Sequence, residues 1–195
     1  MQLKTNVSWS FFFILIIYIK TNTNMIIDCL SKAIFLFVIY NVIALLLFGV
    51  PKSLSMTYYL FKSRQNSLKI MFPTMIVLLC ILLIPCWLTL SEGSNFQFLS
   101  FLAPAALMFV GFTPAFNDAD MYKTIHNVAA YSCAVFAMLW IILVTPFWYI
   151  ILIVLGIISV IAILTKTVKS SYIYWLEMVA FISLFASIIA YYITK

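Results

Sequence analysis

The stretch that decides the fold, residues 125–165, reads IHNVAAYSCAVFAMLWIILVTPFWYIILIVLGIISVIAILT. It contains no Asp, Glu, Lys or Arg, and Pro146 stands in its middle. A bilayer core takes about 20 helical residues, so the stretch predicts two membrane spans, at 125–145 and 147–165. Pro146 suits the first turn of the second helix, where its missing N–H costs no hydrogen bond. Because the link is so short, we expect the two spans to form an antiparallel hairpin.

Apolar segments of spanning length recur on both sides of this pair. They lie at about 33–50, 70–90, 96–114 and 174–193. The chain is 66% hydrophobic and only 8% charged, whereas about 25% of the residues of a soluble domain are charged. The sequence therefore predicts an all-α, polytopic membrane protein, a bundle of six transmembrane helices. Aromatic residues near the expected span ends, among them Trp87 and Tyr174, are predicted to anchor in the membrane interface.

The N-terminal residues 1–24 do not fit the six-span plan. Their apolar part, WSFFFILIIYI at 9–19, is too short to span, and KTNTN follows without a small-residue cleavage site. We interpret 1–24 as a short extension, either an interfacial segment or a stretch upstream of the true start at Met25. Residues 25–195 are then one six-helix transmembrane domain.

Basic residues are distributed unevenly between the two predicted membrane faces. The connections 51–69, 115–124 and 166–173 share one side and carry seven basic residues, against four on the opposite side. The positive-inside rule places the richer side in the cytoplasm and both termini outside. The net charge of +6 is scattered; it suits anionic lipid headgroups and lacks the dense basic face that nucleic acid binding needs.

Cysteine and histidine usage argues against metal or cofactor chemistry. The four cysteines form no C-x-x-C pair and read as small apolar filler. His126 is the only histidine, whereas bis-histidine haem ligation needs two and most catalytic zinc centres need several. We therefore expect no metal and no cofactor.

The scarce ionisable residues gather on the basic side. His126 opens the span at 125–145, and Glu177 lies one turn inside the last span. Such residues at membrane depth usually face a protein interior or a wet cavity. The plainer alternatives are an interfacial histidine bonded to a loop and a glutamate that reaches the interface or bonds a neighbouring helix. Asp118 and Asp120 are explained most simply as caps of the helix that follows them.

Segment 51–69 combines hydroxyl groups with cations. Ser53, Ser55 and Tyr58 lie there beside several basic residues, and such a mixture suits lipid phosphate at a membrane surface. The alternative is an ordinary basic loop. The residues predicted to contact headgroups are Lys52, Lys62, Arg64, Lys69, Lys166 and Lys169.

Two short motifs resemble a known family. The predicted third span ends in GFTPAFND, and the fourth opens on IHNVAA. This plan resembles the six-span DRAM/FRAG/SFK-type superfamily, and it is similar to bacterial six-span membrane proteins of unknown function. Phe116, Asn117 and His126 are the matching positions, whereas Asn127 stands where the eukaryotic members usually carry an acid. Those relatives are usually drawn with the first loop outside, which is opposite to the charge count here. The resemblance implies a role in lipid handling or membrane trafficking.

These observations favour a small, non-enzymatic membrane protein with a polar pocket on its basic side that binds or senses a lipid headgroup or organises the membrane. The predicted ligand-binding residues are His126, Glu177, Asp118, Asp120, Asn127, Ser53, Ser55 and Tyr58.

Two alternatives stay open. A transporter or channel component would use mid-span polar groups such as Asn41, and a membrane-embedded lipid hydrolase would pair His126 with Ser53 or Ser55 and Asp118. Expected partners are membrane lipids, with a second copy or another membrane protein also compatible. The abundance of Ile, Asn and Lys suggests an AT-rich genome, and with it the inner membrane of a bacterium or of the host of a phage.

Overall fold

The computed structural model describes residues 23–113 and 120–194. These residues form seven α-helices and one short 3₁₀ helix, without a strand among them, which confirms the predicted all-α class. The predicted extension 1–24 lies almost wholly outside the described residues. The elements are α2 (Thr23–Phe48), α3 (Met56–Arg64), η1 (Asn66–Ile70), α4 (Met71–Leu90), α5 (Leu99–Phe112), α6 (Asp120–Val144), α7 (Tyr149–Leu164) and α8 (Tyr172–Thr194).

Four described helices are long and apolar enough to cross a membrane. These candidate spans are Ile26–Phe48, Asn66–Leu90, Lys123–Val144 and Tyr172–Thr194. Helices α5 and α7 are apolar but have only 14 and 16 residues. At about 1.5 Å per residue they cover about 21 and 24 Å, less than a hydrocarbon core of about 30 Å. Four of the six predicted spans therefore reach spanning length, which fits a membrane-embedded protein.

One predicted boundary and one predicted loop are wrong. Helix α2 begins at Thr23 rather than near residue 33. Ile26 and Leu30, one helical turn apart, are buried against the bundle, and the exposed Asp28–Lys32 ion pair (2.5 Å) is compatible with a helix there. Helix α6 begins at Asp120, and its candidate span, Lys123–Val144, agrees with the predicted span at about 125–145. Most of segment 51–69, expected as a loop, is helical as α3 and η1. Helix α3 buries Phe61 and its neighbours Thr57 and Tyr58 on one face, and this burial favours the helix.

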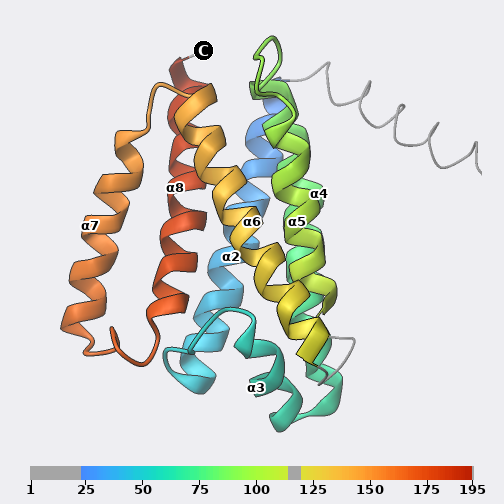
Figure 1. Cartoon of the computed structure of the whole chain (residues 1–195), viewed down its shortest axis with the longest axis vertical. Coiled ribbons are helices and arrows are strands. Elements are labelled where there is room, and N and C mark those ends of the chain that lie inside the picture. The colour runs from blue at the N-terminus through green and yellow to red at the C-terminus, as the bar shows by residue number, and fades with distance from the viewer. Residues whose placement is uncertain (1–22, 114–119, 195) are drawn as a thin grey trace, which may run out of the picture.

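Helices α2 and α4 to α8 run alternately up and down, and α3 crosses the lower end of the bundle (Figure 1). The connection 165–171 lies at that same end, as predicted, whereas the links 91–98 and 145–148 and the end of α8 lie at the other (Figure 1). The lower end carries seven exposed or half-exposed basic residues, and we name it the basic end. These residues are Lys52, Lys62, Arg64, Lys69, Lys123, Lys166 and Lys169.

Helices α6 and α7 run antiparallel but do not close into the expected hairpin. Helix α7 packs chiefly against α8, and α6 crosses the bundle obliquely to pack on α5 (Figure 1). The link at 145–148 is short, yet Thr145 Oγ1 accepts the Phe147 N–H (3.2 Å) and shapes a turn that lets the helices diverge. This divergence separates the lower half of α6 from α8.

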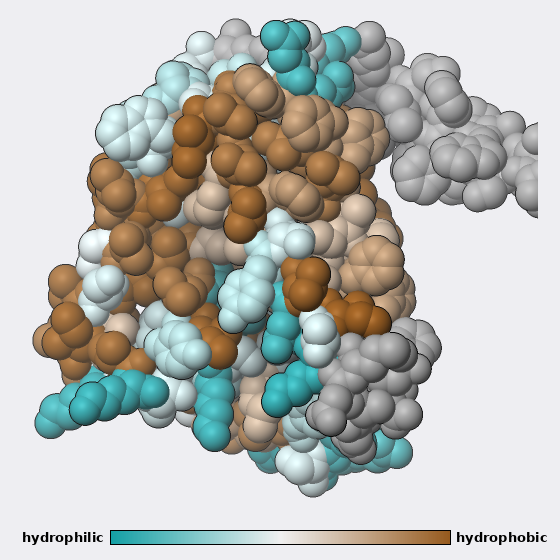
Figure 2. All heavy atoms as spheres, in the orientation of Figure 1, coloured by the Kyte–Doolittle hydropathy of each residue, from teal (hydrophilic) through white to brown (hydrophobic). Residues whose placement is uncertain are grey.

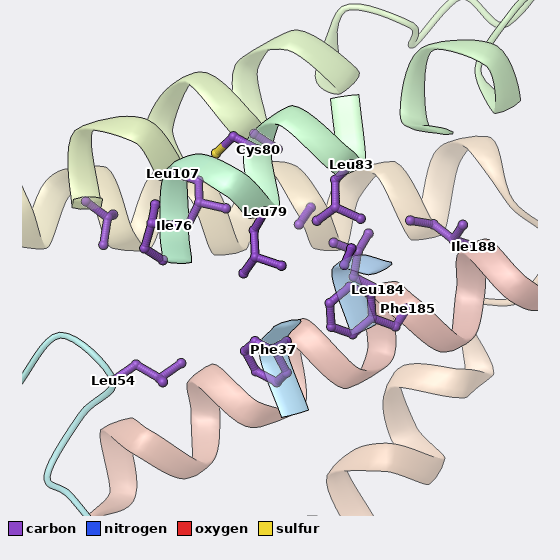
Figure 3. Packing of buried hydrophobic residues seen from close by; sticks show 14 of the residues in the cluster. Phe37, Leu54, Ile76, Leu79, Cys80, Leu83, Leu107, Leu184, Phe185 and Ile188 are labelled. Atoms are coloured by element: carbon purple, nitrogen blue, oxygen red, sulfur yellow. The ribbon is translucent and has the colours of Figure 1, made fainter. Parts of the chain in front are cut away.

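The core lies around α4. Side chains from α2, α4, α5 and α8 meet there, including Phe37, Leu79, Leu107 and Leu184 (Figure 3). The Phe37 ring lies 4.7 Å from Phe181 and 5.5 Å from Phe185, centroid to centroid, so aromatic packing joins α2 to α8.

Buried polar contacts reinforce the junction of α2, α3 and α8. The Tyr174 hydroxyl donates to Asn41 Oδ1 (3.1 Å), and Asn41 Nδ2 donates to the Phe37 carbonyl (2.8 Å). The Tyr40 and Thr57 hydroxyls are also hydrogen-bonded to each other. Asn41, a candidate for a transport pathway by sequence, thus has a structural use. Tyr174 is buried, so its predicted role as an interface anchor is wrong.

Candidate functional site

A cavity of about 470 Å³ lies between α6 and α8, bounded also by α4, α5 and the loop before α3. Its volume falls within the ~300–1,000 Å³ of small-molecule sites. Two of its lining residues, Tyr131 on α6 and Tyr172 on α8, are 68% and 59% exposed, so the cavity opens onto the surface between these helices. The polar lining residues are Ser53, Ser55, His126, Asn127, Tyr131, Tyr172 and Glu177.

Polar and apolar parts of the lining occupy opposite ends. The cavity follows α6 from His126 to Met138 and α8 from Tyr172 to Leu184, a length of about 18 Å on each helix at 1.5 Å per residue. Its polar residues lie toward the basic end, and the rest of the lining is aliphatic, aromatic or Cys133. Figure 2 shows polar residues that continue from the basic end into the otherwise apolar surface between α6 and α8. The site is therefore amphipathic along its length.

His126 is held by the end of α5. It lies in the second turn of α6, half-buried, and its Nδ1 is 2.9 Å from Thr113 Oγ1. The Thr113 hydroxyl donates its proton to the Phe109 carbonyl (2.7 Å). The Thr113 oxygen must then accept a proton from Nδ1, because a hydroxyl has only one to give. In the neutral ring this leaves Nε2 as an acceptor, and the ring lies against the cavity.

Glu177 joins α8 to the loop before α3. Its Oε2 accepts the backbone N–H of Leu54 at 2.6 Å. Two further bonds hold the same loop: the Tyr174 N–H donates to the Lys52 carbonyl (3.1 Å), and the Ser171 hydroxyl donates to the Val50 carbonyl (3.3 Å). These three bonds form a latch between residues 50–54 and the start of α8. The latch presents Ser53 and Ser55 to the cavity.

The two serines are engaged with each other and with their own helix. Their hydroxyls lie 3.1 Å apart, and Ser53 Oγ accepts the Met56 N–H (3.1 Å) at the start of α3. The hydrogen bond described for His126 goes to Thr113 instead of either serine. These contacts therefore do not support a pair of a serine nucleophile and a histidine base.

Five of the eight predicted ligand-binding residues line the one cavity: Ser53, Ser55, His126, Asn127 and Glu177. Tyr58 does not; it is buried in α3 and packs edge-on against Tyr59. Asp118 lies outside the described residues. Asp120 is the first residue of α6 instead of a residue before it, and its side chain is likewise outside the description. The six predicted headgroup cations lie at the basic end, and none lines the cavity.

Sequence reasoning missed Thr113 and the true position of Trp87. Trp87 was expected at the membrane interface, but it is 1% exposed and lines the cavity at its apolar end. Thr113 could have been found from its place after the apolar run of α5, since a hydroxyl at a helix end often bonds the carbonyl four residues before it. Trp87 gives no such signal, because a tryptophan near a span end suits an interface equally well.

The described residues contain no group of three or more His, Cys, Asp or Glu that could hold a metal ion. All four cysteines are free thiols. The residues that line the cavity are polar toward one end and apolar toward the other. No protein-family model, no curated protein and no solved structure matches this chain.

Proposed function

We propose that this chain is a six-span membrane protein that binds an amphiphile in the cavity between α6 and α8, without catalysing a reaction. The observation that carries the proposal is the amphipathic lining, with hydrogen-bonding groups at the basic end and apolar groups beyond them. A lipid has the same order of parts. Its headgroup would lie near His126 and Glu177, and its tail would extend toward Met138 and Leu184.

The opening of the cavity supports a ligand that comes from the bilayer. It lies between two helices of spanning length, Lys123–Val144 and Tyr172–Thr194. Neighbouring surface on α6 is apolar and exposed at Val128, Val135 and Ile142. A membrane lipid could therefore move sideways into the cavity without leaving an apolar environment.

The polar end favours an uncharged headgroup rich in hydroxyl groups. Its groups are the Glu177 carboxyl, the His126 imidazole, the Asn127 amide and hydroxyls, which both donate and accept hydrogen bonds. Among the described residues no lysine or arginine lines it. An acidic side chain without a basic neighbour disfavours a phosphate group. The cations of the basic end then serve the surrounding anionic lipid.

Membrane orientation and location belong to the same proposal. The basic end faces the cytoplasm by the positive-inside rule, and the membrane is the inner membrane of a bacterium or of a phage host. The short helices α5 and α7 complete the six spans if the bilayer thins around them or flanking residues extend them. A general role in lipid handling agrees with the resemblance to the six-span superfamily.

A matched pair of substitutions on α6 tests the proposal. Ala134 lines the cavity, whereas its neighbour Val135 is exposed on the outer face. Ala134→Phe should fill the cavity and remove an amphiphile that copurifies with the wild type, as measured by mass spectrometry of extracted lipids. Val135→Phe adds a ring of the same kind outside and should leave that amphiphile in place.

A third variant tests the headgroup end. His126→Ala should reduce the copurified amphiphile selectively, while bulk phospholipids stay at the wild-type ratio. Identical lipid profiles for the wild type, Ala134→Phe and His126→Ala would refute the proposed function.

A further inference from the structure

Two cysteines lie together where α2 begins and α4 ends, at the end of the bundle opposite to the basic end (Figure 1). The Cys86 thiol of α4 donates to the Ile26 carbonyl of α2, with sulfur and oxygen 3.5 Å apart. A helical carbonyl points toward the residue four places on, so the Cys86 sulfur lies beside the turn of α2 that carries Cys29. Cys29 packs against the same buried core, and the two thiols are close enough to interact electrostatically. The contact between α2 and α4 therefore brings two free thiols near each other.

The pair lies close to the membrane surface at this end. Cys29 is three residues from Ile26, where the candidate span of α2 begins. Cys86 is four residues from Leu90, where the candidate span of α4 ends. At about 1.5 Å per residue, both cysteines are within about 6 Å of a span end. The neighbour of Cys29, Asp28, has a side chain that is 55% exposed and ion-paired, and such a charge lies outside the hydrocarbon. A water-soluble reagent therefore reaches the half-buried Cys29, but not Cys86, which is 0% exposed.

The other two cysteines form a comparable pair in the middle of the bundle. Cys80 of α4 and Cys133 of α6 also interact electrostatically. Cys80 lies ten residues before Leu90, and Cys133 lies ten residues after Lys123. At 1.5 Å per residue each is about 15 Å from a span end, at the centre of a hydrocarbon core of about 30 Å. A charged, water-soluble reagent does not enter this region. The second pair thus has the same functional groups as the first and lacks its access to water.

The end that carries Cys29 and Cys86 faces an oxidising compartment in the proposed orientation. The basic end faces the cytoplasm by the positive-inside rule, so the opposite end faces away from it. Disulfides form and persist on that side of a bacterial inner membrane, whereas cytosolic thiols are kept reduced. Two neighbouring thiols at this surface are therefore open to exchange with a disulfide.

We infer that Cys29 and Cys86 are a redox pair, which a disulfide compound on the side opposite to the basic end oxidises to a disulfide bond between α2 and α4. The inference goes beyond the proposed function and does not require a ligand in the cavity. The Cys29 thiolate attacks the external disulfide, breaks its S–S bond and releases one thiol, which leaves a mixed disulfide. The Cys86 thiolate then attacks the Cys29 sulfur and releases the second thiol. Two electrons and two protons thus pass from the pair to the external disulfide.

Oxidised glutathione tests the inference with the purified, reduced full-length protein in micelles. After an acid quench and denaturation in SDS, a polyethylene-glycol maleimide labels the free thiols, which are counted as gel shifts. The wild type should fall from four labelled thiols to two, and it should return to four after dithiothreitol. Its intact mass should fall by two hydrogen atoms without a bound glutathione, and a peptide digest should contain Cys29 joined to Cys86.

Serine variants separate the attacking thiol from the one that resolves the mixed disulfide. Cys86→Ser should keep one glutathione on Cys29, because no second thiol releases it. Cys29→Ser should keep its three remaining thiols free, because the buried Cys86 is not reached from outside. As matched controls, Cys80→Ser and Cys133→Ser should each still lose two thiols to the disulfide.

Acid quenching of intact cells shows whether the pair is oxidised where the protein works. Wild-type protein from quenched cells should carry two thiols that resist maleimide until a reductant is added. Four free thiols in cells, no loss of thiols with oxidised glutathione, or a crosslink that includes Cys80 or Cys133 would overturn the inference. The wild-type measurements decide the question even if a serine variant fails to fold, and none of them depends on the lipid cavity.

Discussion

Helices α4 and α7 are similar in composition and opposite in position. Both consist almost entirely of apolar residues. Helix α4 has ten buried residues among its 20, spread around the helix, because α2, α5 and α8 all pack on it. Helix α7 has three buried residues among its 16, and these form one stripe: Val154, Ile158 and Ala162.

This difference shows that apolar composition alone does not distinguish the buried faces of a membrane helix from its lipid-facing ones. In a soluble protein an apolar face marks the core, but lipid tails are as apolar as leucine. Apolar composition therefore places a helix in the membrane without showing which face contacts protein. Small residues are a better guide. A Cβ on Gly111 of α5 would come within 2.8 Å of Cγ2 of Ile76 on α4, whereas a Cβ on Gly156 of α7 would meet nothing within 4 Å.

Leucine truncation should give the largest contrast between the two helices. Leu79 on α4 is 0% exposed and Leu152 on α7 is 58% exposed. Leu79→Ala should lower the free energy of unfolding by about 2–5 kcal/mol, because it opens a cavity in the core. Leu152→Ala should change it by less than about 0.5 kcal/mol. Unfolding by SDS titration in mixed micelles measures both, and equal losses would show that α7 packs as tightly as α4.

Glycine substitution comes next in expected size. Gly111→Ala should cost about 1–3 kcal/mol, because Ile76 must move to admit the methyl group. Gly156→Ala should be neutral or stabilise by up to about 1 kcal/mol through helix propensity. The same SDS titration measures both. A harmless Gly111→Ala would contradict the close approach of α4 and α5.

The latch at the basic end depends on a hydrogen bond instead of apolar packing. Glu177→Ala leaves the Leu54 N–H without its acceptor and should cost about 1–3 kcal/mol. Glu177→Gln keeps a side-chain carbonyl there and should lose less than half of that. Thermal unfolding in detergent compares the two. Equal losses in both variants would indicate that the charge of Glu177, more than its role as acceptor, holds the loop.

The smallest effect concerns His126. Thr113→Val removes the oxygen that accepts its Nδ1 proton and should cost about 0.5–1.5 kcal/mol. It should also raise the population of the Nε2–H tautomer. Because the chain has one histidine, ¹⁵N-histidine labelling gives a single imidazole to observe. An Nε2–H tautomer already dominant in the wild type would contradict the assigned hydrogen bond.

Much of the fold could be predicted because its signals are local. Apolar runs placed α4 and α8 to within about two residues, and the alternation of the six predicted spans indicated that the connections before α4 and before α8 share one end. The same alternation predicted His126 and Glu177 at one end, where both line the cavity. Helix α3 was missed because only the burial of Phe61 against distant helices favours it over a loop.

Packing between helices could not be predicted in this way. Helix α6 diverges from α7 because α7 packs on α8, and this divergence shapes the cavity. The sequence does not show which of its several apolar faces a helix such as α7 uses for packing. Tyr58 was predicted to bind the ligand because it carries a hydroxyl group in a polar segment. The sequence does not show whether such a side chain faces a cavity or the core, and Tyr58 faces the core.

The two halves of the latch are synthesised at different times. Residues 50–54 are synthesised before residues 171–177, which hold them. A chain grows from its N-terminus at about 5–20 residues per second, so α2 to α6 leave the ribosome while one wall of the cavity does not yet exist. Only the last helix supplies Glu177 and closes the site. A truncated chain that lacks α8 would therefore lack one wall of the cavity and the acceptor of the Leu54 N–H.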